Sequence, residues 1–163
     1  ACDPSNPNLK VYLAIISFNC TLYCCTGSNV GYAPQFISHN QDSGGGESTT
    51  LSPSRFKEVY EGSQRTFGER GFRNDLIICG GDFVVARVTM TSKMTGPMGG
   101  QAATGKTSVS SATDTYRFKD GKVIERWGNN DGVGMLLQLG LQLPGAPPKA
   151  AASSAPSAAK PKH

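Results

Sequence analysis

Residues that bind metal ions are scarce in this sequence. It has two histidines, His39 and the terminal His163, and none of its five cysteines is spaced from another as Cys-x-x-Cys. Protein zinc sites usually combine cysteines and histidines at such short spacings. The sequence therefore argues against a zinc site, and we expect no metal.

The cysteines themselves are few and odd in number, so at least one thiol stays unpaired in a monomer. They are Cys2, Cys20, Cys24, Cys25 and Cys79. Free cysteines are often small buried hydrophobes, and we expect this of Cys79 and of two of the middle three. The spacing leaves open whether one disulfide forms and which cysteines it joins.

A strong net charge is also lacking. Charged residues make up 17% of the chain, and the formal net charge is +4, of which three positive charges come from Lys149, Lys160 and Lys162 near the C-terminus. The rest of the chain is close to neutral and lacks the basic footprint of a nucleic-acid-binding domain. We therefore expect no nucleic-acid partner.

No apolar run has a comfortable length for crossing a membrane. The longest, from Leu9 to Cys25, contains Lys10 and is interrupted by Asn19, whereas a spanning helix needs about 20 apolar residues. We expect no membrane partner.

Two weak features bear on localisation. The absence of an initial methionine suggests a removed signal peptide, and we expect an extracellular protein, with a cytoplasmic one as the alternative. Asn19-Cys20-Thr21 matches the N-glycosylation pattern. It lies inside an apolar run, however, which favours a chance match.

The N-terminal half has helical features. The run from Leu9 to Cys25 has the length of a mostly buried helix. Residues 26–40 predict a turn and a short helix interrupted near Pro34, and residues 41–50 predict a loop. Ser52 and Pro53 are typical of a helix start, and the glycines at 68 and 71 should end that helix. One face of it carries Phe56, Val59, Tyr60, Ser63 and Phe67.

From Phe72 onward the pattern alternates as in strands. Residues 72–79 and 82–94 predict two strands joined by a turn at Gly80-Gly81. Residues 106–131 predict a second hairpin, whose Asp120-Gly121 turn suits the positive φ angles of a type I′ turn. Helices followed by long antiparallel strands predict an α+β fold, in which the helices cover one face of a strongly curved sheet.

The C-terminal segment divides into a short apolar helix after Asp131 and a tail. Residues 144–163 are rich in proline, alanine, serine and lysine. Such a composition has little to bury and predicts disorder.

One sequence match needs to be set aside. Residues 100–107, Gly-Gln-Ala-Ala-Thr-Gly-Lys-Thr, fit the phosphate-binding pattern G-x-x-x-x-G-K-[ST]. That loop has to open a helix so that backbone N–H groups face the phosphates. The residues after Thr107 are β-branched and polar with no helical stripe, so we expect a loop that enters a strand.

Asp131 is the most prominent candidate for a functional carboxylate. On a continued strand it would share a face with Trp127 and Asn129, and could point into a pocket. A carboxyl group in an apolar pocket has its pKa raised towards the range useful for proton transfer. The alternative is structural, because a carboxylate at this position would also cap the helix that follows.

Other candidates are His39, Asp114, Tyr116 and Arg87. His39 is either a loop or core residue, or a second acid–base group. Asp114 and Tyr116 share one face of their strand, and either face could line a pocket. Arg87 interrupts an otherwise apolar strand, which indicates an edge feature or a cation in a pocket.

The ordered run of these segments resembles a known family. The stretches Gly-Tyr-Ala-Pro-Gln-Phe-Ile-Ser-His-Asn (residues 31–40), residues 80–90 and residues 95–140 are similar to the SnoaL-like polyketide cyclases, within the nuclear transport factor 2-like superfamily. The resemblance covers roughly residues 9–141. Its most specific part runs from Thr104-Gly105-Lys106 through the Asp120-Gly121 turn to Trp127, the following Asp131 and the Gln138-Leu139-Gly140 ending.

The resemblance implies a cone: a curved antiparallel sheet wrapped by N-terminal helices around an internal cavity. We expect this domain over residues 9–143, between an extension at 1–8 and the tail. In the cyclases of this family an aspartate acts as general acid–base in an aldol closure, without a cofactor or metal. By resemblance that aspartate is Asp131, and His39 is its partner.

The resemblance also implies substrate-binding positions and two departures. Trp127 and Asp114 match positions that line or brace the cavity, and we add Arg87 and Tyr116 as substrate-binding candidates. Where the family often has histidine, this sequence has Met94 and Arg126.

The sequence therefore predicts a cofactor-independent cyclase or isomerase. It would move a proton on a hydrophobic, carbonyl-containing small molecule. The alternative is a non-catalytic module of the same fold that binds a small ligand or forms a homodimer through its sheet face.

Overall fold

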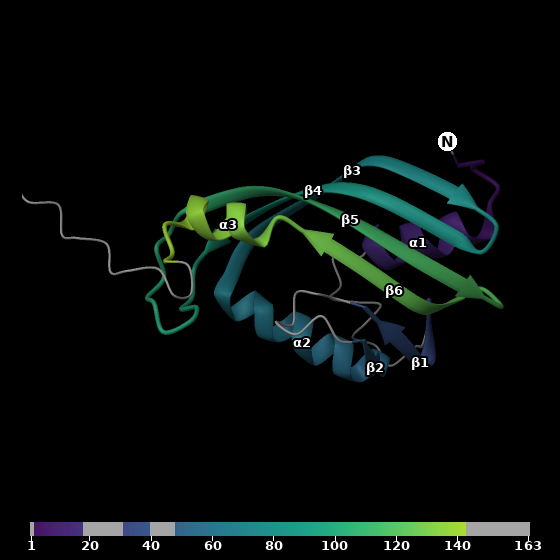
Figure 1. Ribbon diagram of the computed structural model, residues 1–163, viewed down its shortest axis with the longest axis horizontal. Helices are drawn as coiled ribbons and strands as arrows, with labels where there is room; N and C mark the ends of the chain where they lie inside the picture. Colours follow the sequence, from purple (N-terminus) through teal and green to yellow (C-terminus); the bar gives the residue numbers. More distant parts are fainter. Residues whose placement is uncertain (1, 18–30, 40–47, 143–163) are drawn as a thin grey trace, which may run out of the picture.

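The computed structural model describes residues 2–17, 31–39 and 48–142. These residues form three helices and a six-stranded, curved and unclosed sheet with the strand order β2-β1-β6-β5-β4-β3 (Figure 1). The elements are α1 (Pro7–Ser17), β1 (Tyr32–Ser38), β2 (Thr49–Leu51), α2 (Pro53–Thr66), β3 (Phe67–Gly80), β4 (Phe83–Met94), β5 (Thr107–Lys119), β6 (Lys122–Asn130) and α3 (Gly132–Leu139). The predicted α+β cone is confirmed.

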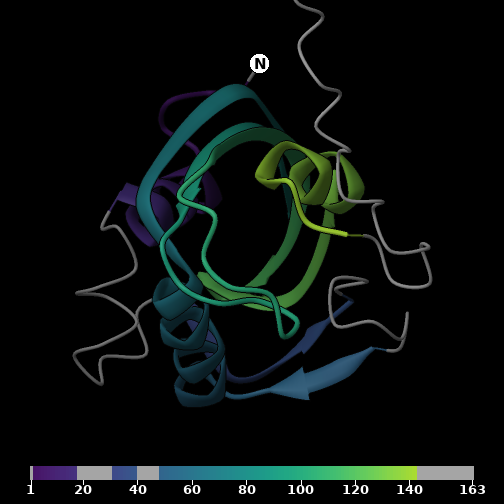
Figure 2. The same ribbon diagram turned by 90° about the vertical axis from the view of Figure 1, so that its left-hand side faces the viewer.

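Long antiparallel strands form most of the sheet. β3, β4, β5 and β6 pair in succession. A tight turn joins β3 to β4 at Gly81-Asp82, one residue later than predicted, and a longer segment joins β4 to β5. The predicted Asp120-Gly121 turn joins β5 to β6, with φ angles of 50° and 69°. These angles are those of a type I′ turn, whose twist matches the twist of the two strands. Viewed along the molecule, the strands curve into an incomplete ring (Figure 2).

The first strand differs from the sequence prediction. Residues 32–38 form a strand instead of a short helix, and β1 runs parallel to β6, so the sheet is mixed rather than purely antiparallel. Pro34 fits because the β1–β6 ladder is irregular between Tyr32 and Ile37, and because β2 pairs only with Phe36 to Ser38. Proline has no N–H to donate, so a strand tolerates it where the ladder is interrupted.

The start of α2 is the one predicted from Ser52 and Pro53. The Ser52 hydroxyl accepts a hydrogen bond from the backbone N–H of Arg55, and Pro53 occupies the first turn. The helix ends earlier than expected, at Thr66, because Phe67 already has extended backbone angles and begins β3. The predicted strand starting at Phe72 therefore begins five residues sooner.

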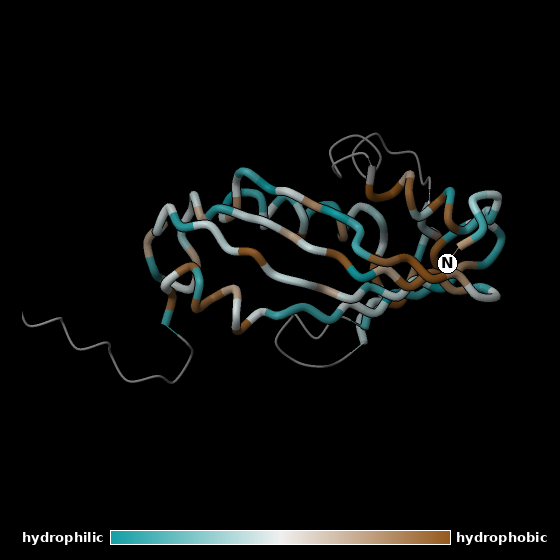
Figure 3. The backbone as a smooth tube through the Cα atoms, turned by 90° about the horizontal axis from the view of Figure 1, so that it is seen from above, coloured by the Kyte–Doolittle hydropathy of each residue, from teal (hydrophilic) through white to brown (hydrophobic). Residues whose placement is uncertain are grey.

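The strand faces divide the molecule into an inside and an outside. On β4, Val84, Ala86 and Val88 are fully buried, whereas Phe83 and Arg87 are exposed. This alternation matches the prediction from the sequence, and it defines an inner, concave face and an outer face. Figure 3 shows hydrophobic segments gathered around α1 and the strand ends next to it.

Two clusters of apolar residues fill the inner side. In the larger one, Leu9 and Tyr12 of α1 pack against Val84, Ala86 and Val88 of β4. At the other end of the sheet, α3 contributes Leu139 to a smaller cluster with Met94 and Leu141. The helices thus close the two ends of a curved sheet, and the space between the clusters is available for a cavity.

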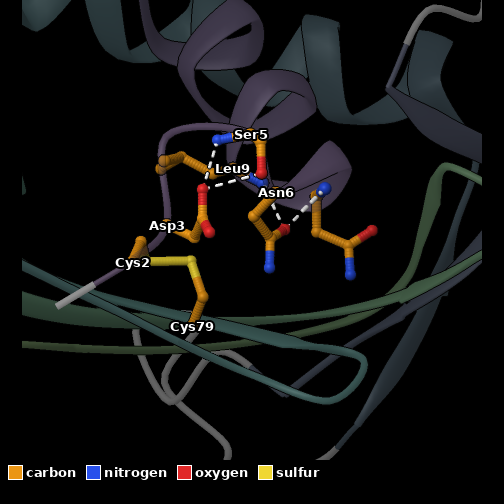
Figure 4. Close-up of a disulfide and its surroundings, with 7 residues drawn as sticks. Cys2, Asp3, Ser5, Asn6, Leu9 and Cys79 are labelled. Carbon is orange, nitrogen blue, oxygen red and sulfur yellow. Dashed lines mark hydrogen bonds between the residues drawn. A yellow bond between two sulfur atoms is a disulfide. The ribbon is translucent and has the colours of Figure 1, made fainter.

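A disulfide ties the N-terminus to the sheet. Cys2 is bonded to Cys79 at the end of β3, so the prediction that Cys79 is a free buried hydrophobe is wrong (Figure 4). Cys79 points to the inner face, where the chain turns to begin α1. The Asn6 side chain accepts hydrogen bonds from the N–H groups of Asn8 and Leu9, and this caps the helix directly after the bridge.

Several predictions fall outside the described residues. They concern Cys20, Cys24, Cys25, the Asn19 glycosylation pattern and the tail from residue 144. The Gly100–Thr107 stretch is described and leads from a loop into β5, as predicted, and not into a helix. None of the described helices has the length and hydropathy needed to span a membrane.

We predict that the Cys2–Cys79 bond contributes strongly to stability, because it closes a loop of 77 residues and holds α1 on the sheet. Adding a reductant should lower the free energy of unfolding, measured by urea titration, by roughly 2–4 kcal/mol. A Cys2→Ser/Cys79→Ser double variant should unfold at the lower value with or without reductant. Equal stability of the wild type in both conditions would contradict the prediction.

Candidate functional site

The inner side of the sheet contains a cavity of about 330 Å³. Side chains from all three helices and from five of the six strands line it. Most are apolar or aromatic, including Ile15, Ile16, Phe56, Phe67, Phe72, Met90 and Met135. Its charged lining residues are Arg70, Asp114 and Arg126. Such a mainly apolar cavity with a few polar groups is typical of a small-molecule site.

The strand register brings Asp114 and Arg126 together. On the β5–β6 ladder, Tyr116 lies opposite Arg126, and Asp114 lies opposite Gly128. Because Gly128 has no side chain, the guanidinium of Arg126 can extend along the face towards Asp114. Its Nη2 donates to Asp114 Oδ1 at 2.7 Å, and both side chains are only 13% exposed.

Arg126 is held in place by aromatic rings as well as by the carboxylate. Its guanidinium carbon lies 5.8 Å from the ring centres of Phe56 and of Tyr116. Burial works against its charge, but the combined interactions with Tyr116, Asp114 and Tyr32 outweigh burial and raise the pKa of Arg126. Arg126 therefore stays protonated and supplies a fixed positive charge next to Asp114.

A second polar pair, Tyr12 and Asn74, lies next to Tyr116. The Tyr12 hydroxyl of α1 donates to the side-chain oxygen of Asn74 at 2.7 Å, and its ring lies 5.4 Å from that of Tyr116. Burial, together with the nearby Tyr116 and Asp114, raises the pKa of Tyr12. Tyr12 is therefore a neutral phenol that links the helix to the site.

The sequence-predicted residues fall into two groups. Asp114 and Tyr116 line the cavity, so the structure decides which of their two strand faces points inward. Trp127 does not line it, because Trp127 is adjacent to the inward-facing Arg126 and points to the outer face. Arg87 lies on the exposed face of β4 and also points outward. The expectation that Trp127 and Arg87 face a cavity is corrected.

His39 belongs to a cluster on the outer face. Its ring stacks on Trp127 at 4.7 Å, with 7° between the planes. Its Nε2 is 2.8 Å from Glu125 Oε1, and its Nδ1 is 2.6 Å from the Ser48 hydroxyl. His39 and Asp114 are therefore on opposite faces of the sheet, and His39 is not brought to the cavity.

Asp131 has the structural position that the sequence analysis weighed as the alternative. It is the N-cap of α3, and its Oδ1 accepts a hydrogen bond from the Gly134 N–H at 2.8 Å. A side chain at position 134 would overlap this carboxylate. Asp131 is exposed and does not line the cavity, so the expectation that it points into a pocket is corrected.

Two charged residues that line the cavity were not predicted as part of a site. Arg126 was noted only as a departure from a histidine, although the odd–even alternation places it on the face opposite Trp127. Arg70 lies between two glycines that were expected to end a helix. Nothing in the sequence pattern indicates its inward direction.

The described residues hold no group of three or more histidine, cysteine, aspartate or glutamate side chains placed to bind a metal ion. The chemistry that they can perform is that of a carboxylate paired with a guanidinium among aromatic rings. Such a carboxylate can accept a proton from a substrate bound in the cavity, and can return it.

We predict that Asp131 contributes to stability through its cap. Asp131→Ala should lower the free energy of unfolding by about 1 kcal/mol, because the first turn of α3 loses its acceptor. Asp131→Asn should be close to neutral, because asparagine is an equally good N-cap. Urea titration of both variants tests this, and an equal loss in both would contradict the cap role.

Comparison with known proteins agrees with this architecture. A family model described as SnoaL-like polyketide cyclase matches residues 29–139. No curated protein matches the chain. Many solved structures are similar in fold.

Three of these structures illustrate the likeness. IdmH from Streptomyces antibioticus, a proposed polyketide cyclase, has a TM-score of 0.68 at 20% identity and covers 83% of this chain and 100% of its own. A proposed polyketide cyclase from Acidithiobacillus ferrooxidans has a TM-score of 0.70 at 20% identity, with 85% and 97% covered. AclR from Streptomyces galilaeus, a proposed hydroxylase, has a TM-score of 0.63 at 22% identity, with 82% and 92% covered.

Proposed function

The chain belongs to the SnoaL-like polyketide cyclase family, and we propose that it is a cofactor-independent enzyme of the cyclase or isomerase type. Its substrate would be a hydrophobic small molecule with a carbonyl group. The observation that carries this proposal is the Asp114–Arg126 pair, which faces an apolar cavity.

Asp114 is the proposed acid–base group. Its carboxylate removes a proton from a carbon next to the substrate carbonyl, which leaves an enolate. In a cyclisation, the enolate carbon attacks a second carbonyl carbon of the same molecule. The new alkoxide then takes the proton back from Asp114. In an isomerisation, the proton returns to a different carbon. Neither course has a net gain or loss of electrons, so neither needs a redox cofactor.

The neighbours of Asp114 suit this role. Arg126 holds one carboxylate oxygen at 2.7 Å, which fixes the direction of the other oxygen. The positive charge of Arg126 also favours the enolate, because negative charge that develops in a low-dielectric cavity is strongly stabilised by a fixed cation. Tyr116, on the same strand face, also lines the cavity, and its proposed role is to contact the substrate.

The apolar lining determines what the cavity can admit. Aliphatic and aromatic side chains from α1, α2 and β3 surround the charged pair. They favour an apolar carbon skeleton and keep water away from an enolate, which would otherwise be protonated before the ring closes.

We predict that the cavity catalyses hydrogen exchange next to a carbonyl. With tetralone in deuterated water as the probe, the wild type should accelerate deuterium uptake, measured by proton NMR. Asp114→Asn should reduce the enzyme-dependent rate by about a hundredfold or more, which is the usual contribution of a positioned base. Asp131→Asn, a carboxylate change outside the cavity, is the matched control and should keep the rate.

The result distinguishes an enzyme from a non-catalytic binding module of the same fold. If the wild type binds tetralone without accelerating exchange, the chain is a binding module and the enzyme proposal fails. A rate that is unchanged in Asp114→Asn, with a normal melting temperature, would show that another group acts as the base.

We also propose that two copies associate through the outer face of the sheet. Leu76 and Ile78 on β3 are about half exposed there, and Phe83 on β4 is about a third exposed. Large apolar side chains exposed on one face of a sheet favour association.

For this homodimer we predict that Ile78→Asp shifts sedimentation velocity from a dimer to a monomer, because it buries a charge in the contact. Val59→Asp places the same charge on an exposed apolar residue of α2 and should leave the dimer intact. Sedimentation of the wild type as a monomer at high concentration would refute the proposal.

A further inference from the structure

The start of β3 contains a bulge whose residues have no role in the proposed reaction. The ladder with β4 pairs Gly68 with Lys93 and then Gly71 with Thr91, so two residues of β3 stand opposite one residue of β4. Glu69, one of the two, has a φ angle of 45°. Positive φ is uncommon for a residue with a side chain, and bulges of this kind often redirect side chains next to functional sites.

The bulge separates two neighbouring charges. Glu69 is exposed, and one of its carboxylate oxygens is 2.8 Å from the Lys93 ammonium. Arg70, the next residue, lines the cavity. Gly71 completes the bulge, since a side chain there would overlap the Thr91 hydroxyl. The local backbone thus directs one particular guanidinium into the cavity.

Arg70 is held rigidly by neutral groups. Its Nε donates to the Phe67 carbonyl at 3.0 Å, and its Nη2 donates to the Ser63 hydroxyl at 2.9 Å. The guanidinium also lies over the Tyr60 ring at 5.2 Å and the Phe67 ring at 5.7 Å. These contacts use two of the five N–H donors of the side chain, so others can bind a ligand.

The charges of the cavity do not cancel. Arg126 is paired with Asp114, whereas no carboxylate of the described residues lies within ion-pair distance of Arg70. The other lining residues that the structure describes are uncharged. A cavity with one excess positive charge and a largely apolar lining favours an anion with an apolar body.

We propose that the cavity takes an acidic apolar molecule, with Arg70 as the counter-ion of its acidic group. That group is a carboxylate or another oxygen anion whose oxygens can accept hydrogen bonds from the fork of a guanidinium. The inference rests on the proposed function in that both use the same cavity. It names the class of substrate, whereas the proposed function names the reaction at Asp114.

Two fluorescent probes of nearly equal shape test the charge preference. Anilinonaphthalene sulfonate carries an anionic group, and N-phenylnaphthylamine has the same aromatic framework without it. Arg70→Met should weaken binding of the sulfonate by about tenfold or more, the usual effect of losing a charge-assisted hydrogen bond. Binding of the neutral probe should change by less than about twofold, because methionine replaces the apolar stem.

Arg65→Met, on the same chain segment but exposed and outside the cavity lining, is the matched control and should leave both affinities unchanged. Equal weakening of both probes, or no weakening of the sulfonate, would overturn the inference. These binding measurements test only the role of Arg70. They can refute that role while hydrogen exchange still depends on Asp114, and loss of the Asp114 dependence would leave the role of Arg70 intact.

A measurement on the wild type covers the case in which Arg70→Met does not fold. Phenylbutyrate and phenylbutyramide differ in charge at one group. The carboxylate should displace N-phenylnaphthylamine at about a tenfold lower concentration than the amide. Equal displacement by the two would overturn the inference.

Discussion

The ion pair between Arg126 and Asp114 is the interaction on which the organisation of this site depends. Two largely buried charges are tolerated in a protein interior only when they are paired and held in good geometry. The β5–β6 register provides that geometry, because Asp114 stands opposite Gly128 and the guanidinium can reach along the face to it. Around this pair the core supplies aromatic rings from α1, α2 and β1. The cavity then has an oriented carboxylate in largely apolar surroundings, and the proposed proton transfer rests on this arrangement.

The two faces of the sheet have different chemistry. The inner face combines apolar side chains with Arg70, Asp114 and Arg126, whereas the outer face carries the His39–Glu125 pair stacked against Trp127. A strand cannot direct neighbouring residues to the same side, so the inward direction of Arg126 requires the outward direction of Trp127. The Cys2–Cys79 bond fastens α1 on the inner side. Disulfides persist mainly in oxidising compartments, and the expectation of an extracellular protein stays a prediction.

Membership of the SnoaL-like family accounts for the fold and a cyclase-type role, but identities near 20% to solved structures leave the reacting groups to be argued from this chain. Two departures matter here. Met94 is fully buried in the apolar cluster under α3 and brings no polar group to the cavity. Arg126 brings a permanent charge where a histidine would titrate. A permanent cation 2.7 Å from one carboxylate oxygen holds the carboxylate in one direction, which suits the base of the proposed reaction.

The sequence by itself determined the features that depend on local physics. The Ser52 cap, the Asp120-Gly121 turn and the alternation along β4 follow from backbone preferences and a period of two, and each is found as predicted. Tertiary structure decided the rest. Pairing with β6 decided that Tyr32 to Ser38 form a strand and not a helix. The curvature of the sheet decided that the strand face carrying Asp114 points inward. Asp131 had two locally reasonable roles, and only the position of α3 selected the cap. The direction of Arg70 depends on a bulge in the pairing of β3 with β4. This pairing joins different segments of the chain, so the local sequence pattern around Arg70 does not predict it.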